Sequence, residues 1–211
     1  YYGNGVDQDY TIAAAYYEEA AKMGNIQAMY HTGFCYSHGM GVEQSYGKAI
    51  EWYKKAALKN YKDAQYNLGI YYRDGQGVEQ DYGQALEWFE KAACQGDAYA
   101  QLAISNMYDK GEGVKQDSVQ ALQWCEKAAS QGLDAAQYNM GVNYEQGIGV
   151  AQDYKKAALW YERAARQGNP QAQYNLSILY DQGNGVEQDS VQAAEWCARA
   201  AEQGYALAQH N

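Results

Sequence analysis

The sequence predicts an all-α fold, an α/α superhelical solenoid of helix–turn–helix repeats, on three observations. A Gly-x-Gly-Val element returns every 36 residues without insertion or deletion, and a Gln follows three residues after its second Gly. All five Trp residues fall at one position of this repeat. The chain has a single Pro, so the breakers of helices are confined to the Gly-marked turns. Self-similarity at a period of this length is typical of units that pack only on their neighbours.

We expect residues 1–211 to form one solenoid, because no linker or shift in composition interrupts the period. Five full units and a partial sixth begin at the first Gly of the repeated element, at Gly3, Gly39, Gly75, Gly111, Gly147 and Gly183. The chain opens at Tyr1 without Met and stops at Asn211 part-way through a unit. We therefore expect it to be a segment of a longer array.

The first helix of each unit is predicted to start after a capping residue. In the unit from Gly75, Asp81 can cap a helix in which Tyr82, Ala85, Trp88, Phe89 and Ala92 share one face. The helix should end where the chain needs a left-handed residue, which Gly or Asn adopts most readily. The residues at this place are Gly24, Asn60, Gly96, Gly132, Gly168 and Gly204.

The second helix is most evident from Ala64 to Tyr72, in which Ala64, Leu68 and Tyr72 step by four residues along one face. Gly69 lies beside that face, where we expect a neighbouring helix to approach closely. Its counterparts are only Gly or Ser, namely Gly33, Ser105, Gly141 and Ser177. In another copy, Asn169 and Pro170 have the order expected of a cap followed by the first helical residue.

The Trp residues are predicted to belong to the core and not to stack on a ligand. Burial of one such ring stabilises a fold by about 1.5–3 kcal/mol, so we expect this series to be the main contact between paired helices. Its members are Trp52, Trp88, Trp124, Trp160 and Trp196.

These motifs together resemble the Sel1-like repeat family, a relative of the tetratricopeptide repeat. The resemblance rests on Ala64-Gln-Tyr-Asn-Leu-Gly, Tyr72, Gly75-x-Gly-Val78 and Trp88 followed by Lys91-Ala-Ala, and it covers nearly the whole chain. It implies an adaptor for protein or peptide partners, as in bacterial signalling, envelope and host-interaction systems and in eukaryotic quality control. It also implies that the helices carrying Tyr-Asn-Leu-Gly line the concave face.

We expect a protein or peptide segment to bind along these helices. Tyr side chains offer flat contact area, and a ladder of Asn side chains could hydrogen-bond a peptide backbone. The expected binding residues are Tyr30, Tyr66, Asn67, Ile70, Asn106, Tyr138, Asn139, Val142, Tyr174, Asn175 and Ile178. The alternative, that the Asn side chains bond within or between helices, stays open. So does a structural role in which the repeats only space apart other domains.

Acidic residues recur at the end of these helices, at Asp109, Glu145 and Asp181. Such charges either form a solvated rim or border the groove and favour basic partners. Two units differ from the others by carrying Ser118 with Cys125 and Ser190 with Cys197, where most others carry two aromatic residues. Both members of the pair are smaller at what we expect to be one packing site, although a duplication of two units would explain the pattern equally well.

No enzymatic function and no cofactor are expected. Ser45 and Lys48 fit the Ser-x-x-Lys of penicillin-recognising acyltransferases, and cysteine-rich members of the resembled family have been linked with β-lactams. Ser45, however, occupies the capping position that Asp81 holds in its own unit. A helix cap is therefore the better interpretation.

A metal site is a weaker hypothesis. His31, Cys35 and His38 are spaced four and three residues apart and could share one helix face. A fourth ligand is not evident, and His31 stands where most copies have the Asn of the Tyr-Asn-Leu-Gly signature. We therefore expect no metal.

Cysteine usage and charge limit the remaining possibilities. Cys125 and Cys197 are two units apart, too far to form a disulfide, and neither Cys35 nor Cys94 has an evident mate. Free, buried thiols favour a reducing compartment such as the cytoplasm. The net charge of -10 argues against a nucleic-acid surface, and no apolar run is long enough to cross a membrane. Tyr1, Tyr2 and the region near His210 lack a capping unit, so we expect end-to-end self-association.

Overall fold

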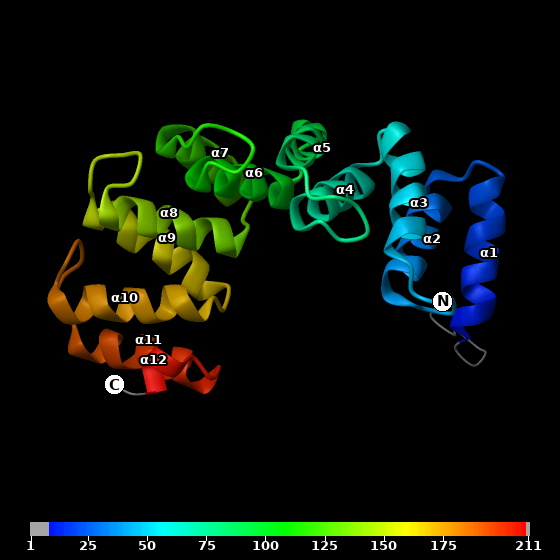
Figure 1. Cartoon of the computed structure of the whole chain (residues 1–211). Helices are drawn as coiled ribbons and strands as arrows, with labels where there is room; N and C mark the ends of the chain where they lie inside the picture. The colour runs from blue at the N-terminus through cyan, green and yellow to red at the C-terminus, as the bar shows by residue number, and fades with distance from the viewer. Residues whose placement is uncertain (1–8, 210–211) are drawn as a thin grey trace. The chain divides into compact units, whose positions relative to one another are not determined.

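The structure is a computed structural model that describes residues 9–209, and these residues form twelve α-helices and no strand. The first Gly-x-Gly-Val element, Tyr1, Tyr2 and His210 lie outside the described residues. The prediction of an all-α helix–turn–helix fold is confirmed (Figure 1). The helices are α1 (Tyr10–Lys22), α2 (Ile26–His38), α3 (Tyr46–Leu58), α4 (Lys62–Asp74), α5 (Tyr82–Cys94), α6 (Ala98–Lys110), α7 (Ser118–Ser130), α8 (Asp134–Gln146), α9 (Tyr154–Arg166), α10 (Pro170–Gln182), α11 (Ser190–Glu202) and α12 (Ala206–Gln209).

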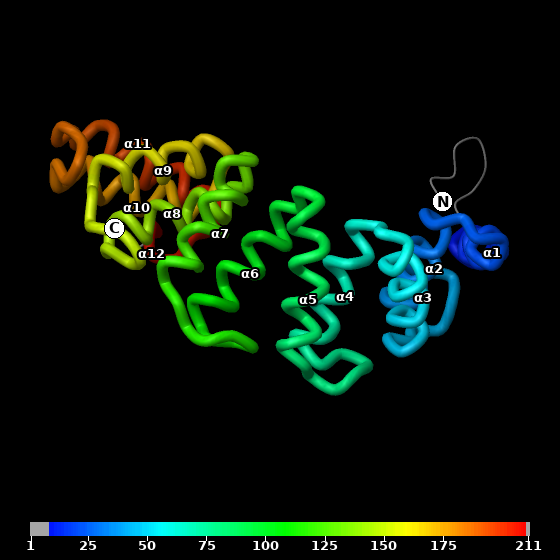
Figure 2. Tube along the Cα trace, turned by 90° about the horizontal axis from the view of Figure 1, so that it is seen from above, coloured from blue at the N-terminus to red at the C-terminus, as the bar shows by residue number. Residues whose placement is uncertain are grey.

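The chain divides within α6 into two compact units, the first ending at Ala100 and the second beginning at Gln101. In the first unit α1, α2 and α3 lie side by side (Figure 2), and α4 packs on both α3 and α5. In the second unit α8, α9, α10 and α11 are stacked in sequence order. In both units the most extensive packing joins two helices connected by a Gly-x-Gly-Val turn, such as α4 with α5 and α8 with α9.

Each helix that follows such a turn begins at the predicted cap. Asp81 accepts a hydrogen bond from the backbone N–H of Gln84 at 2.9 Å, and its own N–H donates to the carbonyl oxygen of Tyr72 at 2.9 Å. The cap therefore satisfies a free N–H of the new helix and ties that helix to the preceding one. Side chains at the same position cap the other helices of this class, and these are Asp9, Ser45, Asp117, Asp153 and Asp189.

The predicted left-handed residues are confirmed at all six places. Their φ angles run from 63° at Asn60 to 95° at Gly24 and Gly168, and Asn60 is the one non-glycine residue with positive φ among residues 9–209. The Asn60 side chain accepts hydrogen bonds from Gln65 and Gln95, each at 3.1 Å. Asn thus supplies two contacts here in addition to the required backbone conformation.

Replacing Gly168 by Val should lower the free energy of unfolding by about 2 kcal/mol, because a β-branched residue is strained at a φ of 95°. No atom lies within 4 Å of the position of its Cβ, so backbone strain alone is tested. Asn60→Gly should cost less than about 1 kcal/mol, the value of its exposed hydrogen bonds. Chemical denaturation of both variants measures the difference, and equal losses would contradict the strain argument.

The second Gly of the turn is required because the preceding repeat approaches it. A Cβ added at Gly149 would collide with the carbonyl oxygen of Ser118 at the start of α7, and φ of Gly149 is 69°. The repeated Gln closes the same turn, since Gln152 Nε2 donates to the carbonyl oxygen of Glu145 at 2.7 Å. Equivalent Gln bonds form at Gln44, Gln80, Gln116 and Gln188. This explains why a Gln accompanies every Gly-x-Gly-Val element in the described part of the chain.

The close approach predicted at Gly69 is confirmed, and it depends on a matched partner. A Cβ at Gly69 would lie 2.5 Å from the ring of Phe89, and a Cβ at Gly33 would lie 2.8 Å from the ring of Tyr53. Gly141 faces Tyr161 in the same manner. Where the small residue is Ser, the position 20 residues later is Cys, in the pairs Ser105 with Cys125 and Ser177 with Cys197. The two positions are therefore complementary in volume in every described helix pair.

The prediction that Trp forms the main buried contact is wrong in part. Trp88 and Trp196 are buried, but the other three Trp side chains are only partly buried. The aromatic side chains with almost no exposure are Tyr53, Phe89 and Tyr161, one position further on. A cation three residues later covers each Trp ring, as Lys55 Nζ does at 3.7 Å from the Trp52 centroid. Trp thus sits at the edge of the core, where the cation covers its outer face.

A series of Gln side chains joins consecutive repeats, with one buried and one exposed Gln in each pair, and it was not predicted from the sequence. Gln137 Nε2 donates to the carbonyl oxygen of Ala129 at 3.2 Å, and Gln137 Oε1 accepts from Gln167 Nε2 at 2.8 Å. The same bond over 30 residues recurs for the pairs Gln65–Gln95, Gln101–Gln131 and Gln173–Gln203. Because a buried amide without partners is costly, each Gln favours the register in which its neighbours are present.

Candidate functional site

The predicted binding residues lie on the helices that precede the Gly-x-Gly-Val turns, namely α2, α4, α6, α8 and α10. Their Tyr side chains are half-buried, and each rests on an aromatic ring that follows it in the chain. The Tyr138 ring centroid lies 5.9 Å from that of Tyr161, and the Tyr174 centroid lies 5.5 Å from that of Tyr205. Tyr30 and Tyr66 pack in the same manner in the first unit. These Tyr residues therefore support the fold as well as offering surface.

The Asn residues do not share one role. Asn175 Nδ2 donates to the Tyr161 hydroxyl at 3.1 Å, and that hydroxyl donates to Glu145 Oε2 at 2.5 Å. Burial, followed by this bond to Glu145, raises the pKa of Tyr161, so the phenol stays protonated. At Asn175 the structure thus shows the bonding between helices that the sequence left open.

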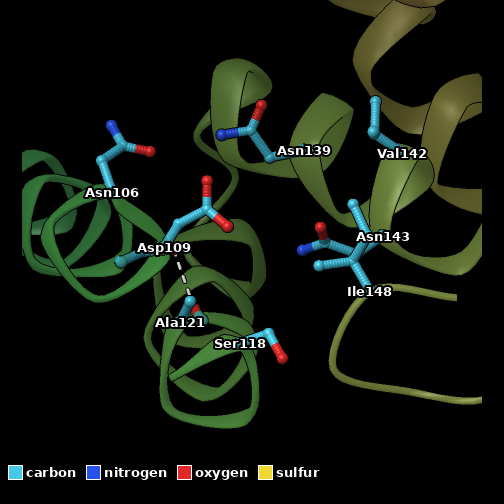
Figure 3. A pocket seen from close by; sticks show the side chains of 9 residues that line it. Asn106, Asp109, Ser118, Ala121, Asn139, Val142, Asn143 and Ile148 are labelled. Atoms are coloured by element: carbon cyan, nitrogen blue, oxygen red, sulfur yellow. Dashed lines mark hydrogen bonds between the residues drawn. The ribbon is translucent and has the colours of Figure 1, made fainter. Parts of the chain in front are cut away.

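A cavity of about 260 Å³ opens among α6, α7, α8 and the turn after α8. It brings together three of the predicted binding residues, Asn106, Asn139 and Val142. Figure 3 shows the amide groups of Asn139 and Asn143 directed from α8 toward the side of the cavity that carries Asp109. The remaining lining residues are Ser105, Ser118, Ala121 and Ile148. The cavity thus combines several hydrogen-bonding groups and one carboxylate with a short apolar wall.

Small residues create this cavity. Ser118 stands where Tyr46 stands in the first unit, and there the Tyr46 ring packs on Tyr71 with centroids 6.0 Å apart. The counterpart of Tyr71 is Asn143, so both rings are missing here. The exchange of Tyr for Ser118 was visible in the sequence. Its consequence for Asp109 and Asn143 was not, because those residues approach Ser118 only in the folded chain.

A second cavity, of about 580 Å³, lies between α10 and α11. Five of its lining residues are the counterparts, 72 residues later, of residues in the first cavity. These are Ser177, Ile178, Asp181, Ser190 and Ala193. Tyr174 and Ile178 come from the predicted binding set, and Cys197 also lines it. The two repeats singled out for their Ser and Cys residues are thus the two that carry these cavities, and both belong to the second unit.

The other predicted binding residues lie outside both cavities. Tyr30, Tyr66, Asn67 and Ile70 belong to the first unit and are half-buried along α2 and α4, while Tyr138 and Asn175 pack against Tyr161 in the second. A shallow depression in the first unit is lined by residues outside the predicted set, Asn60, Glu87, Glu90, Lys91, Cys94 and Gln95.

The three candidate metal ligands are engaged elsewhere. The His31 ring stacks on Tyr17 with centroids 4.9 Å apart, and burial lowers its pKa. His38 stacks on Phe34 with centroids 4.1 Å apart, and Cys35 is buried. Within residues 9–209 no three His, Cys, Asp or Glu side chains are placed to hold a metal ion together.

Ser45 is a helix cap, as predicted, since its hydroxyl accepts from the backbone N–H of Lys48 at 3.4 Å. The four thiols are free, but the prediction that all are buried is wrong for Cys94, which is exposed at the end of α5, and for Cys197, which is only partly buried. Burial raises the pKa of the Cys125 thiol to about 12, so it remains protonated. None of the described helices is both long and apolar enough to span a membrane.

The Sel1 repeat family model matches six consecutive segments, residues 1–25, 26–61, 62–97, 98–133, 134–169 and 170–205. The chain belongs to the Sel1 repeat family. The helix pairs with the most extensive packing coincide with these segments, each of which starts at the helix that carries the predicted binding residues. Sel1 repeats commonly serve as protein-interaction scaffolds, and the fold is a non-catalytic repeat scaffold.

Two solved Sel1 repeat structures are similar in sequence as well as in fold. One is c5321, a protective antigen of uropathogenic Escherichia coli strains with an SLR fold, at 39% identity and a TM-score of 0.95. The alignment covers 98% of this chain and 44% of that protein, so the chain spans less than half of this relative's length. The other is a Sel1 repeat protein from Oxalobacter formigenes, at 32% identity and a TM-score of 0.85, covering 93% and 83% of the two chains. The search of curated proteins found no match.

Proposed function

We propose that this Sel1 repeat chain binds a segment of another protein on the helices that precede its Gly-x-Gly-Val turns, with the main contacts in the second unit. The observation that carries the proposal is the cavity lined by Asn106, Asn139 and Val142, which lies on these helices and offers amide groups beside an apolar wall. Amide groups can both donate to and accept from a peptide backbone. Half-buried Tyr rings nearby add rigid contact area with little conformational entropy left to lose.

A small cavity lined by a few polar side chains is better suited to binding an extended segment than to binding the broad surface of a folded protein. A segment reaches a recessed cavity with one side chain while its backbone follows the helices. The proposal therefore expects affinity to be concentrated in a few residues of the second unit. The spacer role predicts instead that no residue on these helices affects any association.

A variant carrying Asn106→Ala, Asn139→Ala and Val142→Ser tests the proposal without replacing a fully buried residue, and of the three only Val142 packs on the core of the second unit. In a quantitative pull-down from the source organism, we expect this variant to recover at least about tenfold less of the principal protein partner than the wild type. Loss of anchor contacts typically weakens binding to this extent. The partner so identified would then be titrated calorimetrically as a purified protein.

The matched control changes exposed residues on α7 and α9, the helices that follow the Gly-x-Gly-Val turns, with Gln123→Ala, Glu126→Ala and Leu159→Ser. It should retain the partner in full. Circular dichroism must show equal helicity for both variants. An identical set of partners for the wild type and both variants would contradict the proposal and favour a structural role as a spacer between domains.

A further inference from the structure

We infer that the cavity among α6, α7 and α8 binds an arginine side chain of the partner segment, an inference that rests on the proposed function. Asp109 is the one charged residue that lines the cavity. Its carboxylate makes no hydrogen bond or ion pair with any residue from 9 to 209, and neither does the Asn139 side chain. A carboxylate and an amide, those of Asp109 and Asn139, are therefore both available to a ligand in this cavity.

The neighbouring repeat shows how the same place is filled from within. There Glu145, Tyr161 and Asn175 form one chain of hydrogen bonds in which the phenol donates to the carboxylate and accepts from the amide. The counterparts 36 residues earlier are Asp109, Cys125 and Asn139. Because Cys replaces Tyr, no hydroxyl links Asp109 to Asn139.

Cys125 cannot substitute for the missing phenol. Its thiol is fully buried and donates to the carbonyl oxygen of Ala136 at 3.3 Å. The Ser105 hydroxyl is also committed, since it donates to the carbonyl oxygen of Ala121 at 2.8 Å. Because Asp109 is exposed, a hydrogen-bond donor of a bound ligand can reach its carboxylate.

Arginine fits this set of acceptors best. A guanidinium carries its N–H donors in a planar fork, so it can reach the Asp109 carboxylate and the amide oxygens of Asn106 and Asn139 on two helices at once. Its charge complements Asp109 and the acidic balance of the chain, which has a net charge of -10. Its apolar stem can pass along Val142.

The test uses the intact chain and the probe Nα-acetyl-arginine methylamide, followed through the side-chain amide NMR signals of Asn106, Asn139 and Asn143. We expect saturable shifts of these signals. The citrulline derivative, which has the same shape but no charge, should bind about tenfold more weakly, because a charge-assisted hydrogen bond is about twice as strong as a neutral one. Equal affinity for the two probes would overturn the inference.

Three variants locate the site. Asp109→Asn should weaken binding of the arginine probe about tenfold, whereas Glu112→Gln, the same loss of charge three residues away and outside the cavity, should leave it within about twofold. Ser118→Tyr restores the ring found in sibling repeats and should abolish the shifts while the helical fold is retained.

Equal weakening by Asp109→Asn and Glu112→Gln would mean general attraction by an acidic surface, and the arginine assignment would fall. The inference would also be refuted if none of the three Asn side-chain signals shifted. Neither result bears on the pull-down with the cavity variant. The proposed function can therefore stand when this inference fails.

Discussion

Replacing Gly149 by Ala should lower the free energy of unfolding of the second unit by about 3 kcal/mol or more. A side chain there meets two penalties, a left-handed backbone at a φ of 69° and collision with the Ser118 carbonyl of the preceding repeat. The first costs about 1–2 kcal/mol and the second, as overpacking against backbone, about 1–3 kcal/mol. Because backbone atoms form the obstacle, no side-chain rearrangement relieves it. Chemical denaturation measures the loss.

Gly147→Ala is the matched control in the same turn. Its φ is 74°, and the atoms nearest to an added Cβ are 3.5 Å away, so only the backbone penalty applies. It should cost about 1–2 kcal/mol. Equal losses for Gly147→Ala and Gly149→Ala would show that the close approach of the two repeats contributes nothing.

Gly69→Ser and Phe89→Cys should each destabilise the first unit strongly and should partly rescue one another. A side chain at Gly69 would push into the Phe89 ring, 2.5 Å from an added Cβ, at a cost of about 1–3 kcal/mol. Phe89→Cys leaves a cavity in place of a fully buried ring and should cost about 3 kcal/mol or more. The double variant recreates the natural pair of Ser105 with Cys125, so its loss should be smaller than the sum by at least about 1 kcal/mol.

The control for this cycle combines Gly69→Ser with Tyr161→Cys, whose residues belong to different compact units. These two losses should add. Additivity in the Gly69 and Phe89 pair as well would contradict the claim that the two positions compensate each other in volume.

The repeat made most of the fold predictable from sequence. A capping residue such as Asp81 and a left-handed residue such as Asn60 act through their own backbone neighbourhood, so their spacing alone defines where helices begin and end. Burial was harder to assign. Trp88 and Phe89 are adjacent on one helix, and which ring is covered more completely depends on the glycine of another helix that faces it.

The candidate site was predictable only in part, for the same physical reason. Asn106, Asn139 and Val142 could be placed on one surface from helix periodicity and the resemblance. The cavity itself arises from what is missing at Ser118 and Asn143, which are 25 residues apart on different helices. One sequence reports the size of each side chain but not which two side chains share a space.

The matching of Gly with an aromatic residue, and of Ser with Cys, also determines how such an array can be cut and rejoined. Both members of each match lie within one segment, as Gly69 and Phe89 do within residues 62–97. Recombination between repeats at positions such as 61 and 97 keeps every match intact. A crossover inside the Gly-x-Gly-Val turn, between a repeat with a Gly–aromatic match and a repeat with a Ser–Cys match, would pair Ser with an aromatic residue in one product and Gly with Cys in the other. The first product has excess volume and the second has a void. The helix pair is thus the module that can be gained, lost or shuffled without repacking, even though the glycine turn is the more conspicuous landmark in the sequence.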